Sequence, residues 1–174
     1  TGARQDNYAT MAHRQPGSAI KPFMDYGPYF EYTDATPNTI ILDAPYTYTN
    51  GTNIFNAARD YKGFITAKQA LAESRNIPAL KVFQSVDRQK IANYVHSFGI
   101  DYGQNLYESA SIGAFDGVTA LEMSAAYGAY ARGGYYIEPY SYTQITYRDN
   151  GEIYVKATKK TKVCSKKTAK YIND

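Results

Sequence analysis

A serine and a lysine stand three residues apart, at Ser18 and Lys21, inside the segment of residues 14–23. Residues at positions i and i+3 share one face of a helix, so the hydroxyl and the amine can meet without help from the rest of the fold. Serine by itself is a weak nucleophile and needs a base within hydrogen-bond reach, and a partly buried lysine is suited to be that base. The spacing therefore predicts a serine nucleophile activated by a lysine.

The residues around this pair predict where its helix begins. Pro16-Gly17 is typical of a turn, and Pro22 lacks an N–H group, which a helix tolerates only in its first turn. Ser18 is therefore expected at or next to the start of a helix that runs to about Phe30. The positive end of the helix dipole would then favour a developing alkoxide on Ser18 and disfavour a charge on Lys21.

A second polar pair, Ser74 and Asn76, follows a predicted helix that Thr66 caps. Pro78 restricts the residue before it, so both side chains are expected on the short connection between two helices, free to point into a cleft. Taken alone, the tripeptide Ser74-Arg75-Asn76 would favour a simpler reading in which Asn76 caps a helix over Ile77–Ser85.

The rest of the chain is predicted to mix short strands with helices. Residues 39–64 are short apolar stretches broken by Asn, Asp and Gly, which favours hairpins or irregular loops, and an Asn50-Gly51 turn is preferred to a glycosylation site. Residues 1–4 are expected to end a strand and residues 5–13 to form a polar loop. The remaining predictions are helices at Asp87–Phe98, from the segment 109–123 to about Arg132 and at Ser165–Asp174, and a hairpin of strands Tyr135–Tyr147 and Glu152–Ala157.

Length and composition limit the class of protein. The 174 residues are 44% hydrophobic and carry a net charge of +3, which suits one globular domain and gives no indication of a nucleic-acid partner. Cys164 is the one cysteine, so no internal disulfide is possible, and no apolar run approaches membrane-spanning length. His13 and His96 are expected on a loop and on the surface rather than as metal ligands, and the lysines of residues 156–170 on a solvated face.

The two motifs together resemble those of a known family. Arg-Gln-Pro-Gly-Ser18-x-x-Lys21-Pro-Phe and the later Ser74-x-Asn76 are similar to the first two motifs of class A penicillin-binding proteins, the cell-wall transpeptidases of bacteria. The stretch 109–139 is similar to the block that follows the second motif in that family. The resemblance implies a mixed α/β (α+β) fold of the penicillin-binding protein and serine β-lactamase type, with residues 1–174 as a helix-rich partial transpeptidase domain carrying part of the antiparallel sheet.

The third motif of the family, Lys-Thr-Gly or Lys-Ser-Gly, is missing. Lys160-Thr161-Lys162 and Lys167-Thr168-Ala169 lack the glycine and come too early. In the family this motif lies on an edge strand, binds the substrate carboxylate and adjoins the oxyanion hole, where one lost donor costs about two to three orders of magnitude in rate. The chain is therefore expected to be a fragment, with the rest of the domain beyond Asp174 or on a separate chain, and with a membrane anchor and a glycosyltransferase domain before Thr1.

The resemblance also implies a role for each motif residue. Ser18 attacks the D-Ala-D-Ala carbonyl of a peptidoglycan stem peptide, and the amine of a second stem peptide resolves the acyl-enzyme; β-lactams acylate the same serine. Lys21 is the base, Ser74 relays protons, and Asn76 holds the lysine and the substrate amide, while Arg75 receives no catalytic role. Neither a metal nor an organic cofactor is required by this chemistry. The implied location is the extracytoplasmic, cell-wall side of the bacterial membrane.

Two other functions remain open. One is a hydrolase that passes the acyl group to water, as D,D-carboxypeptidases and β-lactamases do, although no Glu-x-x-Leu-Asn segment of class A β-lactamases precedes Gly117. The other is a non-catalytic module, either a β-lactam sensor that acylates without turnover or a partner-binding platform that uses the lysines. Glu122 is read as a helix-surface residue rather than a hydrolytic base.

Overall fold

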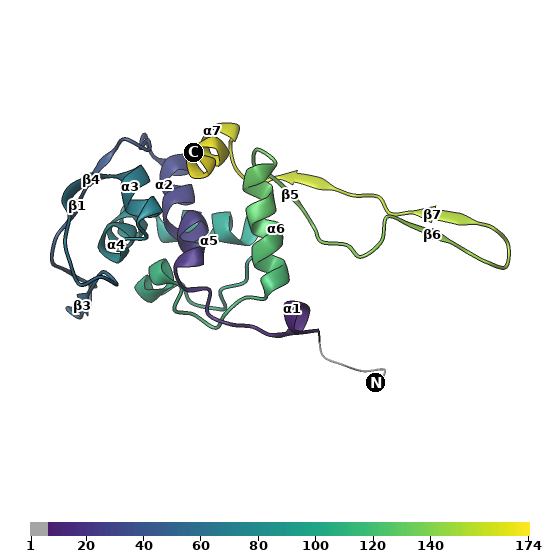
Figure 1. The fold of residues 1–174 in the computed structure, drawn as a ribbon, viewed down its shortest axis with the longest axis horizontal. Coiled ribbons are helices and arrows are strands. Elements are labelled where there is room, and N and C mark those ends of the chain that lie inside the picture. The colour runs from purple at the N-terminus through teal and green to yellow at the C-terminus, as the bar shows by residue number, and fades with distance from the viewer. Residues whose placement is uncertain (1–6) are drawn as a thin grey trace.

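The computed structural model describes residues 7–174. Its helices gather in one body, and a long two-stranded arm that ends in the strands β6 Gln144–Thr146 and β7 Ile153–Val155 projects from one side (Figure 1). The helices are α1 Tyr8–Met11, the 3₁₀ helix η1 Gly17–Ile20, the π-helix η2 Pro22–Tyr26, α2 Gly27–Tyr32, α3 Ala67–Ala72, α4 Asn76–Gln84, α5 Arg88–Ser97, the 3₁₀ helix η3 Glu108–Ile112, α6 Ala120–Ala131 and α7 Lys166–Asn173.

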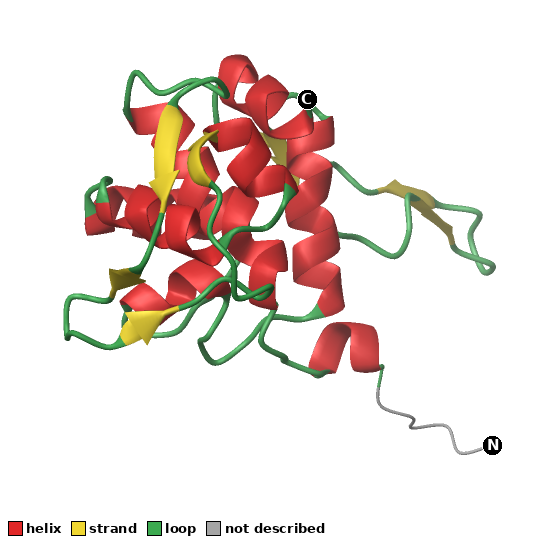
Figure 2. Cartoon of the chain, turned by 60° about the vertical axis from the view of Figure 1, so that its left-hand side comes forward, coloured by secondary structure: helices red, strands yellow, loops and turns green. Residues whose placement is uncertain are grey.

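The strands pair two by two, some at the edge of the helical body and some along the projecting arm (Figures 1 and 2). Within residues 7–174 the four pairs are antiparallel: β1 Ile40–Asp43 with β4 Gly63–Thr66, β2 Tyr46–Thr47 with β3 Asn53–Ile54, β5 Tyr135–Ile137 with β8 Lys160–Lys162, and β6 Gln144–Thr146 with β7 Ile153–Val155. The β2–β3 hairpin turns at Asn50-Gly51, as predicted, with the Gly51 N–H donating to the Tyr48 carbonyl at 2.9 Å.

The helix that carries Ser18 and Lys21 starts at Gly17, where the sequence places it, but it changes type along its length. The Lys21 N–H donates to the Ser18 carbonyl, which closes the 3₁₀ turn of η1. Pro22 has no N–H to donate, which a helix tolerates at this position. The π-helix η2 follows, with the Gly27 N–H donating to the Pro22 carbonyl, before α2 becomes regular. Single turns of π-helix occur frequently at functional sites.

An aromatic cluster fixes this helix in the middle of the protein. Phe23 is fully buried and stacks on Tyr130 of α6 at a centroid distance of 5.0 Å, and its ring edge meets Phe98, which follows α5, at 5.3 Å. The Tyr130 hydroxyl donates to the Pro22 carbonyl at 2.5 Å. Burying a side chain such as Phe23 stabilises the fold by about 1.5–3 kcal/mol, so the helix that positions Lys21 is held firmly between α5 and α6.

A close approach of two glycines fixes the turn in front of Ser18. Gly113 ends η3 with a φ of +82°, a conformation that side chains rarely adopt. A Cβ atom at this position would meet the backbone of Gly17, lying 2.5 Å from its nitrogen and 2.6 Å from its Cα. Only glycine therefore lets η3 pack directly against the start of η1.

Two sequence predictions are wrong in detail. Residues 8–11 form α1 instead of loop, because the Asn7 side chain accepts the Ala9 N–H and starts a helical turn. The single strand predicted over Tyr135–Tyr147 is two strands, β5 and β6, which pair with different partners. Pro139 separates them, since a residue without an N–H group interrupts a ladder of hydrogen bonds. The strand expected at residues 1–4 lies outside the described residues.

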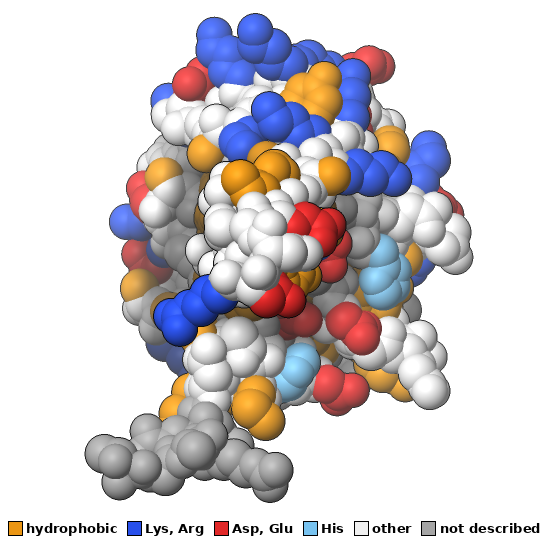
Figure 3. All heavy atoms as spheres, turned by 90° about the vertical axis from the view of Figure 1, so that its right-hand side faces the viewer, with side chains coloured by type: hydrophobic (Ala, Val, Ile, Leu, Met, Phe, Trp, Pro, Cys, Tyr) orange, Lys and Arg blue, Asp and Glu red, His pale blue; other side chains and the backbone are white. Residues whose placement is uncertain are grey.

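The other predicted helices are confirmed to within a few residues. Thr66, Asp87 and Ser165 cap α3, α5 and α7 with their side chains. Glu122 forms a capping box with Thr119 at the start of α6, which agrees with a structural rather than a hydrolytic role. The lysines at 159, 160, 162, 166, 167 and 170 are exposed, and lysine and arginine side chains gather at the level of α7 in Figure 3.

Candidate active site

The Lys21 side chain is the centre of the candidate site. Lys21 is only 1% exposed, and its Nζ donates three hydrogen bonds: to the Ser74 carbonyl at 2.7 Å, to Ser74 Oγ at 3.1 Å and to Asn76 Oδ1 at 2.8 Å. An ammonium has three donors, so the three acceptors satisfy it completely. The residues of the second motif, more than fifty positions away in the sequence, thus close around the lysine of the first.

Burial makes this lysine a better base. Desolvation lowers the pKa of Lys21 from 10.5 to about 8, and a negative charge on Asp25 would oppose this shift. At pH 7 roughly a tenth of the molecules then hold a neutral amine, far more than for an exposed lysine. A neutral amine within reach of a hydroxyl is able to accept its proton.

Ser18 lies one turn before Lys21 and is exposed. In a 3₁₀ helix the side chains of residues i and i+3 eclipse one another, so Ser18 and Lys21 leave η1 on the same side of the helix axis, one turn apart. The Ser18 hydroxyl makes no hydrogen bond within residues 7–174, so the predicted contact with the lysine amine is not formed in this structure. Catalytic hydrogen bonds are often long in a free enzyme and tighten when substrate binds.

Ser74 occupies a position that glycine normally takes. The end of α3 forms a Schellman motif, in which the Arg75 N–H bonds the Ala70 carbonyl at 2.9 Å and the Ser74 N–H bonds the Leu71 carbonyl at 3.0 Å. Ser74 is the left-handed residue of this motif, with a φ of +54°. Such strain costs of order 1–3 kcal/mol and concentrates at functional sites. The strained turn directs both Ser74 oxygens at Lys21.

We expect Ser74→Gly to stabilise the protein and to damage the site. Glycine adopts the left-handed conformation freely, so the free energy of unfolding should rise by about 1 kcal/mol. The same change removes the hydroxyl next to Lys21, and covalent reaction at Ser18 should slow by about ten- to a hundredfold. Chemical denaturation and the rate of labelling by a fluorescent penicillin measure the two effects. A variant that is both less stable and fully reactive would contradict this assignment.

Asn76 is the first residue of α4, not part of the connection before it. Its side chain does not cap the helix, because Oδ1 accepts from Lys21 and Nδ2 donates to the Phe55 carbonyl at 2.9 Å. The helix-cap interpretation of Asn76 is therefore wrong, and the side chain faces the lysine as the family resemblance implies.

The sequence analysis does not predict Asp25 as part of the site, although this residue follows Lys21 by one helical turn. It is fully buried, and neither of its carboxyl oxygens has a hydrogen-bond partner within the described residues. Burial raises the pKa of Asp25 well above its ordinary value, an effect that the charges of Lys21 and Arg88 only partly oppose. The neutral acid is therefore favoured in the folded protein.

Asp25→Asn is expected to stabilise the protein in a pH-dependent way. The unfolded chain releases the Asp25 proton from about pH 4 upward while the folded chain retains it, so the wild type loses stability as the pH rises above this value. The variant has no such loss. The free energy of unfolding of the variant, relative to that of the wild type, should therefore increase as the pH rises from about 4 toward 7. Asp34→Asn, at an exposed position, is the control, and equal curves for Asp25→Asn and wild type would refute the prediction.

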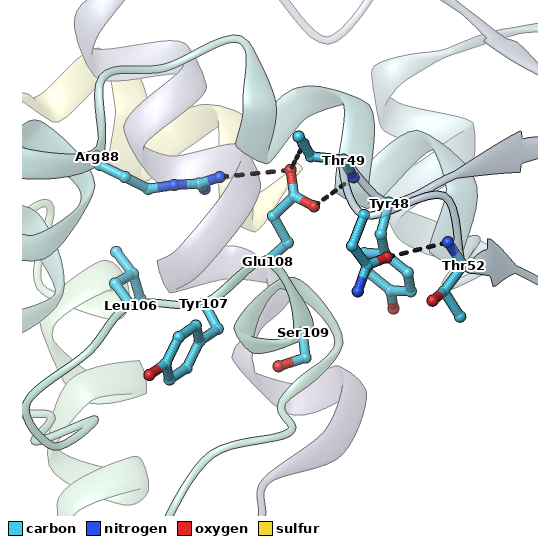
Figure 4. A pocket seen from close by; sticks show the side chains of 9 residues that line it. Tyr48, Thr49, Thr52, Arg88, Leu106, Tyr107, Glu108 and Ser109 are labelled. Carbon is cyan, nitrogen blue, oxygen red and sulfur yellow. Dashed lines mark hydrogen bonds and ion pairs between the residues drawn. The ribbon is translucent and has the colours of Figure 1, made fainter.

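A large hollow lies apart from the four predicted residues (Figure 4). Its volume is about 770 Å³, and it is lined by residues of the β2–β3 turn, α5 and the start of η3. Inside it, Glu108 accepts the Thr49 N–H at 2.8 Å and the Thr49 hydroxyl at 2.6 Å and lies 3.7 Å from an Arg88 nitrogen. These contacts tie three elements together and give the lining a structural role.

A family model described as the penicillin binding protein transpeptidase domain matches residues 2–174. The chain belongs to this family. Penicillin-binding protein 1A/1B of Bacillus subtilis (strain 168) is 42% identical over 151 residues, which cover 84% of this chain and 16% of the relative. Penicillin-binding protein 1A of Streptococcus pneumoniae is 36% identical, with coverage of 84% and 21%. The family predicted from the two motifs is confirmed.

Solved structures confirm the transpeptidase fold. Penicillin-binding protein 1A from Haemophilus influenzae superimposes with a TM-score of 0.84 at 25% identity, covering 95% of this chain and 30% of that protein. The chain spans only 16% and 21% of the length of the two curated relatives named above.

Within residues 7–174, no helix is long and apolar enough to cross a membrane, and no three potential metal ligands of the His, Cys, Asp or Glu type converge.

Proposed function

We propose that this chain forms the acylating part of a serine D,D-transpeptidase that cross-links peptidoglycan. The observation that carries the proposal is the buried Lys21 amine, held by Ser74 and Asn76 through three hydrogen bonds, one helical turn after Ser18. A desolvated and oriented base one helical turn from an exposed hydroxyl is suited to activate that serine for acyl transfer. Family membership supports the same chemistry.

In the proposed acylation, Ser18 Oγ attacks the carbonyl carbon of the D-Ala-D-Ala bond. The hydroxyl proton moves to the neutral amine of Lys21, an ester forms and the C–N bond breaks. Ser74 Oγ, 3.1 Å from Lys21 Nζ, relays the proton to the departing nitrogen, so D-alanine leaves as the amine. Asn76 holds Lys21 and binds the substrate amide. The amine of a second stem peptide then attacks the ester and loses its proton along the reverse path, which forms the cross-link and frees Ser18.

A β-lactam would react at the same serine. Attack by Ser18 Oγ opens the lactam C–N bond and leaves a penicilloyl ester. For the whole gene product we propose the setting that the family resemblance implies, a membrane-anchored enzyme on the cell-wall side of the bacterial membrane with a glycosyltransferase domain. The rest of the transpeptidase domain would supply the third motif, on the same or a separate chain.

Intact-mass measurement of the whole gene product after incubation with penicillin tests this proposal. We expect one adduct per molecule, located by peptide mapping on the peptide that contains Ser18 and stable for many minutes. Rapid release of the penicilloyl group would indicate a β-lactamase-type hydrolase instead. Absence of an adduct, with an adduct on a known penicillin-binding protein in the same experiment, would refute the acyl-enzyme mechanism.

A further inference from the structure

Arg75, the middle residue of the second motif, forms one buried ion pair, with Asp43, and a second ion pair with the partly exposed Asp60. Its side chain is 6% exposed, and its guanidinium donates to Asp43 Oδ2 through Nε at 2.8 Å and through the second nitrogen at 2.6 Å. The remaining nitrogen pairs with Asp60 Oδ1 at 2.6 Å, and the Asp60 carbonyl accepts a further bond at 2.7 Å. Arginine is suited to this role because its planar fork binds two acceptors at once.

The contacts of Asp43 lead from this arginine back to the site. Asp43 ends β1, its side chain is fully buried, and its Oδ1 accepts from Asn56 Nδ2 at 2.7 Å. Asn56 is itself 2% exposed and donates also to the Asp60 carbonyl at 2.9 Å. The two carboxylates and the amide thus surround Arg75 with a closed network that involves β1 and the loop after β3.

Asn56 connects this network to Asn76, the residue whose side chain holds Lys21. Its Oδ1 accepts the N–H groups of Asn76 at 2.9 Å and Ile77 at 3.2 Å, which are the first two orphan donors of α4. The neighbouring Phe55 carbonyl accepts from Asn76 Nδ2. The backbone and the side chain of Asn76 are therefore both oriented from the segment of residues 55–56, which leaves Oδ1 of Asn76 aimed at Lys21.

A buried ion pair of this kind contributes little net stability, because the cost of removing both charges from water offsets their attraction. Such a pair does specify one geometry, and here the geometry is that of the strained Ser74 turn and the start of α4. We infer that Arg75 is a positioning residue for acylation, acting through Asp43 and Asn56 on Asn76 and so on Lys21. This inference rests on the proposed transpeptidase function.

Arg75→Lys tests the inference with the charge retained and the forked geometry lost. The acylation rate constant of the whole gene product, measured with a fluorescent penicillin well below the melting temperature, should fall by about ten- to a hundredfold, since small misplacements of catalytic groups have effects of this size. Arg88→Lys is the matched control, because Arg88 also faces a carboxylate but has no hydrogen bond to the second motif within the described residues. The control should react at the wild-type rate.

A double-mutant cycle separates positioning from general loss of structure. Asn56→Ala should slow acylation to a similar degree, and the double variant Arg75→Lys/Asn56→Ala should be no slower than the slower single variant, because both changes break one chain of contacts. Amide hydrogen exchange at Asn76 and Ile77 should quicken in Arg75→Lys but not in Arg88→Lys, a readout that does not depend on activity.

Three results would overturn the inference: an unchanged rate in Arg75→Lys, additive effects in the double variant, or unchanged exchange at Asn76 and Ile77. Asp60→Asn is a milder variant for the case in which Arg75→Lys does not fold. The Asp60 side chain is 44% exposed, and its replacement leaves the Arg75–Asp43 pair in place. Acylation by Asp60→Asn should slow in the same direction but by a smaller factor. If the wild type itself forms no adduct, the proposed function fails together with a role of Arg75 in acylation. If the wild type and Arg75→Lys both acylate at the normal rate, the positioning role of Arg75 is refuted while the proposed function stands.

Discussion

Replacing Ser18 by alanine will abolish the covalent penicillin adduct while leaving the protein as stable as the wild type. The hydroxyl is exposed and makes no hydrogen bond within the described residues, so its removal should change the free energy of unfolding by less than about 0.5 kcal/mol. Without the nucleophile no acyl-enzyme forms, and a loss of more than about four orders of magnitude is expected, as for other removed catalytic serines. Intact mass and thermal denaturation, measured on the same samples, check both parts.

Ser97→Ala is the control for this experiment. Ser97 is also a helical serine, and its hydroxyl donates to the Tyr94 carbonyl at 2.6 Å, so its loss should lower stability slightly and leave the adduct intact. A full yield of adduct in Ser18→Ala would contradict the assignment of the nucleophile. Loss of the adduct together with a large fall in melting temperature would show instead that Ser18 is a structural residue.

The parts of the site that local sequence could predict are those that a helix creates by itself. The spacing of Ser18 and Lys21, the turn at Pro16-Gly17 and the limit set by Pro22 all act within one or two turns, so the start of the helix follows from the sequence. The change to a π-helix after Pro22 depends on how the helix packs between α5 and α6. No local pattern carries that information.

The supporting residues could not be predicted because they come from distant segments without a motif. Asp43, Asn56 and Arg75 meet through the pairing of short strands and the loops between them, and their sequence neighbours give no indication of the contact. Ser74 is a further example, since a helix end of this geometry is typically a glycine and the serine gives no local signal of a left-handed conformation. The break in the strand after residue 137 is different, because Pro139 has no N–H group and its position in the sequence indicates that the strand ends there.

Lys21→Met is expected to slow acylation by about two to four orders of magnitude, the usual contribution of a general base. Methionine has a similar length and suits a buried position, but it cannot accept the Ser18 proton. The wild-type acylation rate should rise with pH and reach half its maximum near pH 8, the pKa to which burial lowers Lys21, whereas the residual rate of the variant should not change through this range. A variant that acylates at the wild-type rate would remove Lys21 from the mechanism.

The stability of Lys21→Met provides an independent check of the same pKa. An unfolded chain holds the lysine proton up to about pH 10.5, whereas the folded chain releases it near pH 8, so in this window the unfolded state binds more protons and wild-type stability rises with pH. The difference between the two pKa values corresponds to about 3 kcal/mol. The free energy of unfolding of the wild type, relative to that of Lys21→Met, should therefore increase by about this amount between pH 7 and pH 10.5, while contributions from titrating groups that do not interact with Lys21 cancel in the comparison. Parallel curves would mean that burial does not shift the pKa of this lysine, and a neutral amine would then be too rare at pH 7 to serve as the base for Ser18.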